Sequence, residues 1–209
     1  MIGEIMDLND KQLDALQEMG NIGASHAATS LSRMLMNEIS MTVPEVHTID
    51  IADISDYFGE EICTMVVFEI QGTIDPAGYI VYHVPIQSAI RMTNAMLGMD
   101  DEDREINEMD ESALLEVGNI MVSHFLDATA ELLGIVMLPS PPELAIDMAH
   151  ASFENIIAQV ACDINEILLF STELKESEND IRSTIVLLPE EKTLTKILTL
   201  LDNLLEQVP

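Results

Sequence analysis

The chain has 209 residues, 48% of them hydrophobic, and a formal net charge of −30 with only 8 Lys and Arg. A surface this acidic repels phosphate backbones and anionic lipids, which disfavours binding to nucleic acid or to a membrane surface. No apolar run approaches the roughly 18 residues of a membrane span, and the first ten residues lack a signal-peptide pattern, so we expect a soluble cytoplasmic protein.

The acidic charge has two interpretations. It can be a solvated surface suited to a saline cytoplasm, in which salt screens self-repulsion. Alternatively, it can steer the chain towards a basic patch on a protein partner. The two cysteines, Cys63 and Cys162, both lie in apolar stretches, where we expect reduced thiols buried in strands.

The first predicted element is a long helix over residues 9–37. Asn9 can cap its start, and Gln12, three residues later, completes a pattern close to a capping box. Three apolar runs then predict strands at about 45–51, 61–71 and 78–84, with a hairpin turn at DPAG, residues 75–78. A closing helix is predicted to begin after Pro85 and to stop at Gly98.

After an acidic connection over residues 100–111, which we interpret as solvated, the chain repeats itself. Residues 9–26 align with 107–124 without a gap, at nine identities in 18 positions. The identities are Asn9/Asn107, Ala15/Ala113, Leu16/Leu114, Glu18/Glu116, Gly20/Gly118, Asn21/Asn119, Ile22/Ile120, Ser25/Ser123 and His26/His124. The offset of 98 residues holds at Pro44 and Pro142 and grows to 104 at Pro85 and Pro189. The chain is therefore two diverged copies of one unit.

The second copy predicts a helix from Asn107 to about Gly134 and a closing helix after Pro189. Between them lie four apolar runs where the unit calls for three strands, at about 143–149, 153–163, 166–174 and 183–188. Because three-stranded units rarely stand alone, we expect an α/β (α+β) fold with a pseudo-twofold axis. In it a duplicated α-β-β-β-α unit forms one shared sheet of about six strands, backed by helices. This predicts a single domain, 1–209, made of pseudo-repeats at about 8–98 and 106–206.

A polar stripe lies on each long helix, apart from the apolar stripe that faces the core. Four side chains follow the i, i+4, i+7, i+11 rhythm in each copy and fall within about 60° of one another. They are Asp14, Glu18, Asn21 and Ser25 in the first copy, and Ser112, Glu116, Asn119 and Ser123 in the second. A generic solvated face explains one such stripe but explains two matching stripes poorly. The Glu and Asn heads, about 5–6 Å apart at Cβ, can contact one partner surface together.

Glycines lie inside both helices, at Gly20, Gly23 and Gly118. Each costs about 1 kcal/mol relative to Ala in a helix interior. Close approach of the sheet or of the twin helix usually offsets such a cost. We therefore expect the glycines to fix how the polar stripes are presented.

The residues Asp14-x3-Glu18-x2-Asn21-x22-Pro44 and Ser112-x3-Glu116-x2-Asn119-x22-Pro142 both fit a signature with a long, fixed spacing. It resembles that of the CheC/CheX/FliY family of chemotaxis phosphatases, and a chain with two motifs and little else resembles the CheC type. The resemblance implies a phosphatase that hydrolyses the aspartyl phosphate of the response regulator CheY. It also implies the receptor deamidase CheD as a second partner, and we expect the chain itself to be a monomer.

On this interpretation Asn21 and Asn119 orient the attacking water, because an amide offers both a donor and an acceptor without adding negative charge. Glu18 and Glu116 dock the regulator through its active-site Lys, and Asp14, Ser25, Ser112 and Ser123 shape the partner interface. The resemblance also implies a Mg²⁺ ion in the reaction, which we expect to be bound by the regulator and not by this chain. The sequence has no HExxH, CxxC or P-loop pattern, so we expect this chain to bind no metal or cofactor. The alternative is a non-catalytic adaptor of the same fold that binds CheY or CheD.

Overall fold

The computed structural model of the chain describes residues 9–50, 53–73, 78–160 and 166–206. The first copy contains α1 (Asp10–Leu35), β1 (Ile39–Met41), β2 (Glu45–Asp50), α2 (Ile54–Phe58), β3 (Ile62–Gly72), β4 (Gly78–Pro85) and α3 (Ile86–Leu97). The second contains α4 (Glu108–Leu133), β5 (Met137–Pro139), β6 (Glu143–Met148), α5 (Ala149–Val160), β7 (Glu166–Glu176), β8 (Ile181–Pro189) and α6 (Glu191–Glu206). The duplicated order of elements matches the repeat in the sequence.

The two motif helices begin in the same way. In α1 the backbone N–H of Gln12 donates to Asn9 Oδ1 at 3.0 Å, and in α4 the backbone N–H of Asn107 donates to Asp110 Oδ2 at 2.9 Å. Both capping boxes are complete and both helices are 26 residues long. The capping signals therefore located the starts of both helices correctly.

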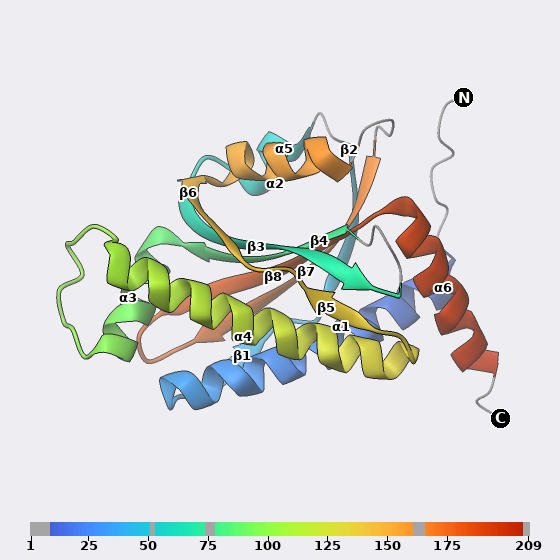
Figure 1. Cartoon of the computed structure of the whole chain (residues 1–209), viewed down its shortest axis with the longest axis horizontal. Coiled ribbons are helices and arrows are strands. Elements are labelled where there is room, and N and C mark those ends of the chain that lie inside the picture. Colours follow the sequence, from blue (N-terminus) through green and yellow to red (C-terminus); the bar gives the residue numbers. More distant parts are fainter. Residues whose placement is uncertain (1–8, 51–52, 74–77, 161–165, 207–209) are drawn as a thin grey trace.

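The helices form layers on the two faces of one curled antiparallel sheet (Figure 1). On one face α1 and α4 lie side by side and run in opposite directions, with α3 and α6 near opposite ends of the pair (Figure 1). Their apolar stripes and the facing sheet residues make the larger core, which includes Leu16, Leu114 and Phe68. On the opposite face α2 and α5 cover a smaller core around Phe153.

The strands of the two copies are exchanged. In the first copy β1 and β2 pair with β7 of the second, and in return β5 and β6 pair with β3 of the first. The two halves meet where β4 pairs with β8, with Val81 opposite Val186. Each copy therefore completes the sheet edge of the other, so we propose that the two pseudo-repeats fold as one domain.

The sheet is larger than the sequence predicted. Within the described residues it has eight strands instead of about six, because β1 and β5 escaped detection. Each is only three residues long, too short to show an alternating pattern. The turn predicted at residues 75–78 lies, apart from Gly78, outside the described residues.

The apolar run at 153–163 was wrongly predicted as a strand. Its described part belongs to α5, a helix of 12 residues, where the first copy has α2 with five. Phe153, Ile156 and Ile157 are all buried, and their spacing of three and four residues is helical. Most of the net insertion of six residues lies in this longer helix, which explains the change of offset between the copies.

Candidate functional site

The first polar stripe faces solvent along α1. Asp14, Glu18, Asn21 and Ser25 are all exposed, while Leu16, Gly20 and Leu31 are buried on the other side of the helix. The helix period thus separates the two sets of residues as predicted. Within the part of the chain that the structure describes, no hydrogen bond or ion pair engages the Glu18 carboxylate or the Asn21 amide.

The second stripe lies along α4 in a more sheltered setting. Ser112 and Glu116 are exposed, whereas Asn119 and Ser123 are half-buried. The Ser112 hydroxyl donates to the backbone carbonyl of Glu108 at 2.9 Å, so it is held against its own helix. Among the described residues, the side chains of Glu116 and Asn119 have no protein partner either.

Each Asn follows a glycine at which the buried face of the helix is in close contact with a neighbouring residue. A Cβ on Gly20 would lie 3.1 Å from Pro44 Cβ, and one on Gly118 would lie 2.7 Å from Val66 Cβ in β3. Gly23 faces the twin helix, where a Cβ would lie 2.8 Å from the Phe125 ring. The predicted close approach of the sheet and of the twin helix is confirmed. In the first copy, the proline of the Asn-x22-Pro pattern is Pro44, the residue that packs against Gly20 next to Asn21.

The two Glu/Asn pairs form separate sites. Since Gly23 faces Phe125 in an antiparallel helix pair, Asn21 and Asn119 lie on the order of 12 Å apart along the helix axes at 1.5 Å per residue. Each Glu lies farther from the pair's centre than its own Asn, towards the beginning of its helix. The geometry therefore gives two like sites that point outward.

The start of α4 is anchored by a buried ion pair that the sequence interpretation missed. Asp110 is 0% exposed and Arg104 is 14% exposed, and Arg104 Nη2 donates to Asp110 Oδ1 at 2.8 Å. Arg104 also donates to Asn94 Oδ1 and Thr93 Oγ1, both in α3. The Arg104 hydrogen bond lowers the pKa of Asp110 to about 2. The one basic residue within the acidic connection was the signal that could have revealed this anchor.

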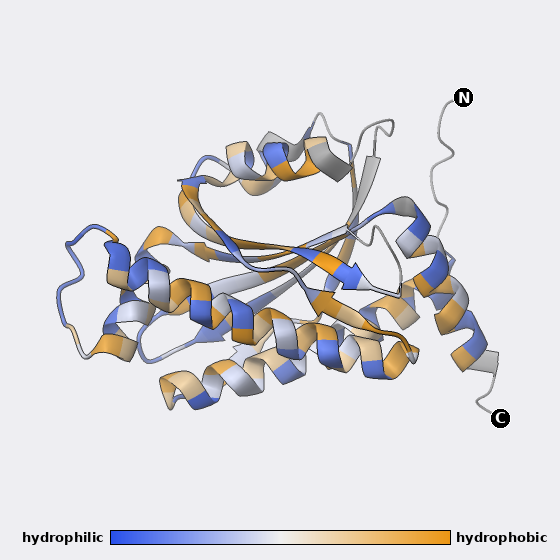
Figure 2. Ribbon diagram, viewed as in Figure 1, coloured by the Kyte–Doolittle hydropathy of each residue, from blue (hydrophilic) through white to orange (hydrophobic). Residues whose placement is uncertain are grey.

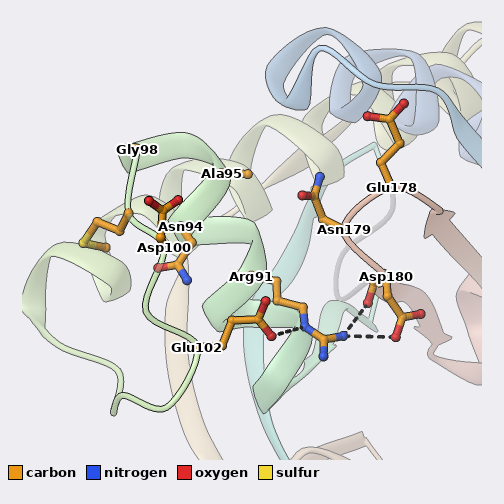
Figure 3. Close-up of a pocket in the computed structure, with 10 residues that line it drawn as sticks. Arg91, Asn94, Ala95, Gly98, Asp100, Glu102, Glu178, Asn179 and Asp180 are labelled. Carbon is orange, nitrogen blue, oxygen red and sulfur yellow. Dashed lines mark hydrogen bonds and ion pairs between the residues drawn. The ribbon is translucent and has the colours of Figure 1, made fainter.

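The acidic connection itself is exposed at most positions, as predicted, and Figure 2 shows it as largely hydrophilic. A second clamp, around Arg91, also holds it. Arg91 bonds Glu102 at 2.9 Å and Asp180 at 3.0 Å, across a hollow of about 550 Å³ (Figure 3). Because its only lining cation is paired with these two carboxylates and no motif residue lines it, we treat this hollow as a structural junction.

Other potentially reactive groups lie away from the stripes. Cys63 is a buried free thiol in β3, and burial raises its pKa to about 12, while Cys162 lies outside the described residues. No group of three or more His, Cys, Asp or Glu side chains among the described residues is arranged to hold a metal ion. Nor does this part of the chain contain a helix long and apolar enough to cross a membrane.

The CheC-like family model matches the chain twice, at residues 12–48 and 109–146. Each match begins in a motif helix and ends in the strand after Pro44 or Pro142, so it covers both copies of the site.

Individual proteins agree with this match. The chain is 26% identical over 195 residues to a Bacillus subtilis protein named CheY-P phosphatase CheC, which covers 91% of this chain and 93% of that protein. The crystal structure of Thermotoga maritima FliY has a TM-score of 0.77 at 22% identity and covers 95% of this chain and 99% of that one. The FliM middle domain from H. pylori has a TM-score of 0.64 at 14% identity and covers 92% of this chain and 99% of that one. The structural likenesses show the fold, and the two matches of the family model lead to one conclusion: the chain is similar to the CheC-like family in both copies of its motif.

Proposed function

We propose that the chain is a phosphatase that hydrolyses the aspartyl phosphate of a CheY response regulator, with one site on α1 and one on α4. The observation that carries the proposal is the pair of outward-facing Glu/Asn sets. In each set the Glu and Asn side chains have no protein partner among the described residues. The helix that carries them is packed closely against the rest of the protein at the glycine before the Asn. The name of the Bacillus subtilis relative supports the same activity.

The chemistry asks little of this chain beyond positioning. An aspartyl phosphate is already activated, and the regulator's own Mg²⁺ neutralises charge on the phosphoryl oxygens. The water oxygen bonds to phosphorus as the bond from phosphorus to the Asp oxygen breaks, which releases inorganic phosphate carrying the protons of the water. Asn21 or Asn119 holds that water in line through its amide. Neither amide titrates, so each works at any physiological pH.

Glu18 and Glu116 are the docking groups. Each lies one helical turn before its Asn and is exposed, so its carboxylate can pair with a Lys beside the phosphorylated Asp of the regulator. With a net charge of −30 the chain repels the phosphoryl group at long range, so a local cation on the regulator is needed to orient the complex. Asp14, Ser25, Ser112 and Ser123 extend the same surface.

We infer from the family resemblance that the receptor deamidase CheD is a second partner of a chain that is itself a monomer. The proposal assigns no metal or cofactor to this chain. A titration of CheD into the chain, followed by sedimentation velocity, checks both points: we expect the free chain to sediment as a monomer and the mixture to form a larger species.

A non-catalytic adaptor is the second candidate, and the likeness to the FliM middle domain favours considering it. At 14% identity this likeness concerns the fold alone. The adaptor would bind the regulator through the same glutamates, and its asparagines would have no chemical task. Two Glu/Asn pairs at one spacing favour the enzyme, since binding alone does not require the amides.

Phosphate release separates the two candidates. CheY phosphorylated with a small-molecule phosphodonor is mixed with the chain, and inorganic phosphate is followed in time against the regulator alone. We expect release to be accelerated in proportion to the concentration of the chain. Binding of the phosphorylated regulator without any acceleration would establish the adaptor.

A further inference from the structure

The two motifs have different neighbours at equivalent positions. On α4 the stripe continues one turn before Ser112 to Met109, whose side chain is exposed. The equivalent residue on α1, at the offset of 98, is Lys11. The second stripe therefore begins with an apolar side chain and the first with a cation.

A second difference lies on the sheet edge beside α4. Ile62 in β3 pairs with Met148 in β6, and Thr64 pairs with Ile146, two residues along the same strands. Together with Met109 they form an exposed set, which we call the apolar edge: Met109 is 62% exposed, Ile62 53%, Met148 41% and Ile146 40%. The sequence has polar or charged residues at the equivalent positions around the first motif: Lys11, Thr48 and Asp50 in the first copy, and Glu166 in β7 of the second copy, the strand that pairs with β2.

The apolar edge continues the surface of the second site. Gly118, between Glu116 and Asn119, packs on Val66 of β3, and Val66 pairs with Leu144 of β6. Leu144 packs against the core beneath α4. Ile146 is two residues further along the strand, about 6.6 Å away and on the same face of the sheet. In Figure 1 this end of β6 and the start of β3 lie above the first half of α4.

We propose that the apolar edge is a specificity-determining part of the second site, where it contacts an apolar surface of the phosphorylated regulator beside the Lys that Glu116 binds. The inference rests on the proposed function, because the occupant is the same regulator. The first site, with Lys11 and Asp50 in two of these places, recognises the regulator mainly through charges. The two sites thus perform the same chemistry with different docking preferences.

The regulator is the occupant that the geometry favours. Met109 lies on the same stripe as Glu116 and Asn119, so a protein that covers those two residues from outside the helix also covers Met109. Three exposed apolar side chains on one sheet edge, with a fourth on the neighbouring helix, in a chain with 38 Asp and Glu are the type of surface that marks a protein interface. A second copy of the chain is less suited, since two surfaces of like charge would repel each other.

The experiment isolates each site in the full-length chain. The Asn21→Ala variant leaves the second site to act, and Asn119→Ala leaves the first. Met109→Gln and Ile146→Thr, made separately in the Asn21→Ala background, should each raise the KM for phosphorylated CheY about fivefold while kcat changes much less, because burial of part of one apolar side chain is lost. The same changes in the Asn119→Ala background should leave both constants as they were.

Leu138→Ser is the matched control. Leu138 is 53% exposed and pairs with Gln71, so it lies on the opposite face of the same sheet edge, and Ser is the equivalent residue of the first copy. Its substitution should change neither background. Unchanged thermal unfolding of every variant shows that the fold is intact.

Direct titration with fluorescently labelled, phosphorylated CheY separates the two proposals. If the chain binds without releasing phosphate, the proposed function fails, and the affinity lost on Met109→Gln still decides the role of the apolar edge. Equal effects in both backgrounds, no effect in the Asn21→Ala background, or no binding by the unmodified chain would overturn the inference. So would an effect on self-association in place of CheY binding, which would assign the apolar edge to a second copy.

Discussion

The two copies present the same Glu/Asn pair on different supports. In the first copy Asn21 is exposed, its helix packs on Pro44 through Gly20, and the helix start is held by a neutral capping box. In the second copy Asn119 is half-buried, its helix packs on β3 through Gly118, and a buried ion pair anchors the helix start.

This difference shows that duplication preserved the outward-facing stripe more closely than the contacts that hold it. On the proposed function a partner contacts the heads of Glu and Asn, so their spacing on the helix is constrained directly. The buried face of the helix needs only a closely packed apolar neighbour at its glycine. Pro44 provides it in the first copy and Val66 in the second. The following predictions test where the copies are equivalent and where they are not, from the largest expected effect to the smallest.

Separating the copies should abolish the fold. Residues 1–100 lack β6 and β7, the partners of β3 and β2, so their sheet edges and apolar faces are left open. We expect this fragment to show no cooperative unfolding transition by circular dichroism and to aggregate or remain unfolded. A fragment that unfolds cooperatively as a stable monomer would instead make each copy a domain.

The helix starts should differ in what they contribute to stability. Arg104→Met leaves the carboxylate of Asp110 buried without its cation, which typically lowers the free energy of unfolding by about 3 kcal/mol. The corresponding change in the first copy, Gln12→Met, removes two exposed hydrogen bonds, one from the Asn9 backbone N–H and one to Asp202, and should lower it by under about 1 kcal/mol. Urea unfolding of both variants measures the difference. Equal losses of unfolding free energy would mean that the buried ion pair stabilises its helix start no more than the neutral capping box does.

The same ion pair predicts an acid-sensitive helix start. The pKa of Asp110 is lowered from 3.8 to about 2 by Arg104, so its contribution is fully present above pH 3.8 and is lost as the pH falls through about 2. A shift of this size corresponds to about 2 kcal/mol of unfolding free energy. Urea unfolding of the wild type should show this loss between about pH 4 and pH 2, relative to Arg104→Met, which lacks the interaction.

Replacing the helix glycines with Ala should also destabilise the chain more in the second copy than in the first. Ala at position 118 would place its Cβ 2.7 Å from Val66 Cβ, a contact that neighbours must shift to accommodate, whereas at position 20 the distance to Pro44 Cβ is 3.1 Å. The gain in helix propensity is about 1 kcal/mol in each case. We expect Gly118→Ala to destabilise the chain by about 1–2 kcal/mol and Gly20→Ala to be closer to neutral, as measured by thermal unfolding. The reverse order would show that the support of the first helix is the stiffer one.

Substitutions of the two glutamates proposed to dock the regulator should have the same effect in both copies and leave stability almost unchanged. Glu18→Lys and Glu116→Lys alter exposed side chains, so each should shift the unfolding free energy by under about 0.5 kcal/mol. Each should nevertheless weaken the binding of phosphorylated CheY at its own site, because two cations then face each other. Titration of the regulator, with melting temperature as the control, checks this. A large fall in melting temperature would make the glutamates structural.

Sequence patterns predicted the parts of the fold with strong local signals. Asn9 and Asn107 marked the helix starts, Pro85 and Pro189 preceded the closing helices, and the strands from Ile62 and Gly78 began within a residue of their predicted positions. These features depend on capping chemistry, backbone restriction and apolar periodicity, all readable within a few residues.

Features that depend on distant pairing could not be predicted in this way. The strand exchange between copies follows from which sheet edge β2 and β6 join, and no local pattern records that choice. The half-burial of Asn119 likewise depends on neighbours outside its helix, since Asn21 has the same flanking letters and is exposed. The repeat predicted two like stripes, whereas their different surroundings emerge only when the chain is folded.

Phosphate release by the Asn variants tests the central claim most directly. With CheY phosphorylated to the same level, Asn21→Ala should retain the activity of the second site, and Asn119→Ala that of the first. The double variant should lose on the order of 10²-fold in rate, the typical contribution of a positioning residue, while still binding the regulator through Glu18 and Glu116. A double variant as fast as the wild type would reduce the asparagines to binding groups, and a wild type without any acceleration would contradict the assignment of the chain as a phosphatase.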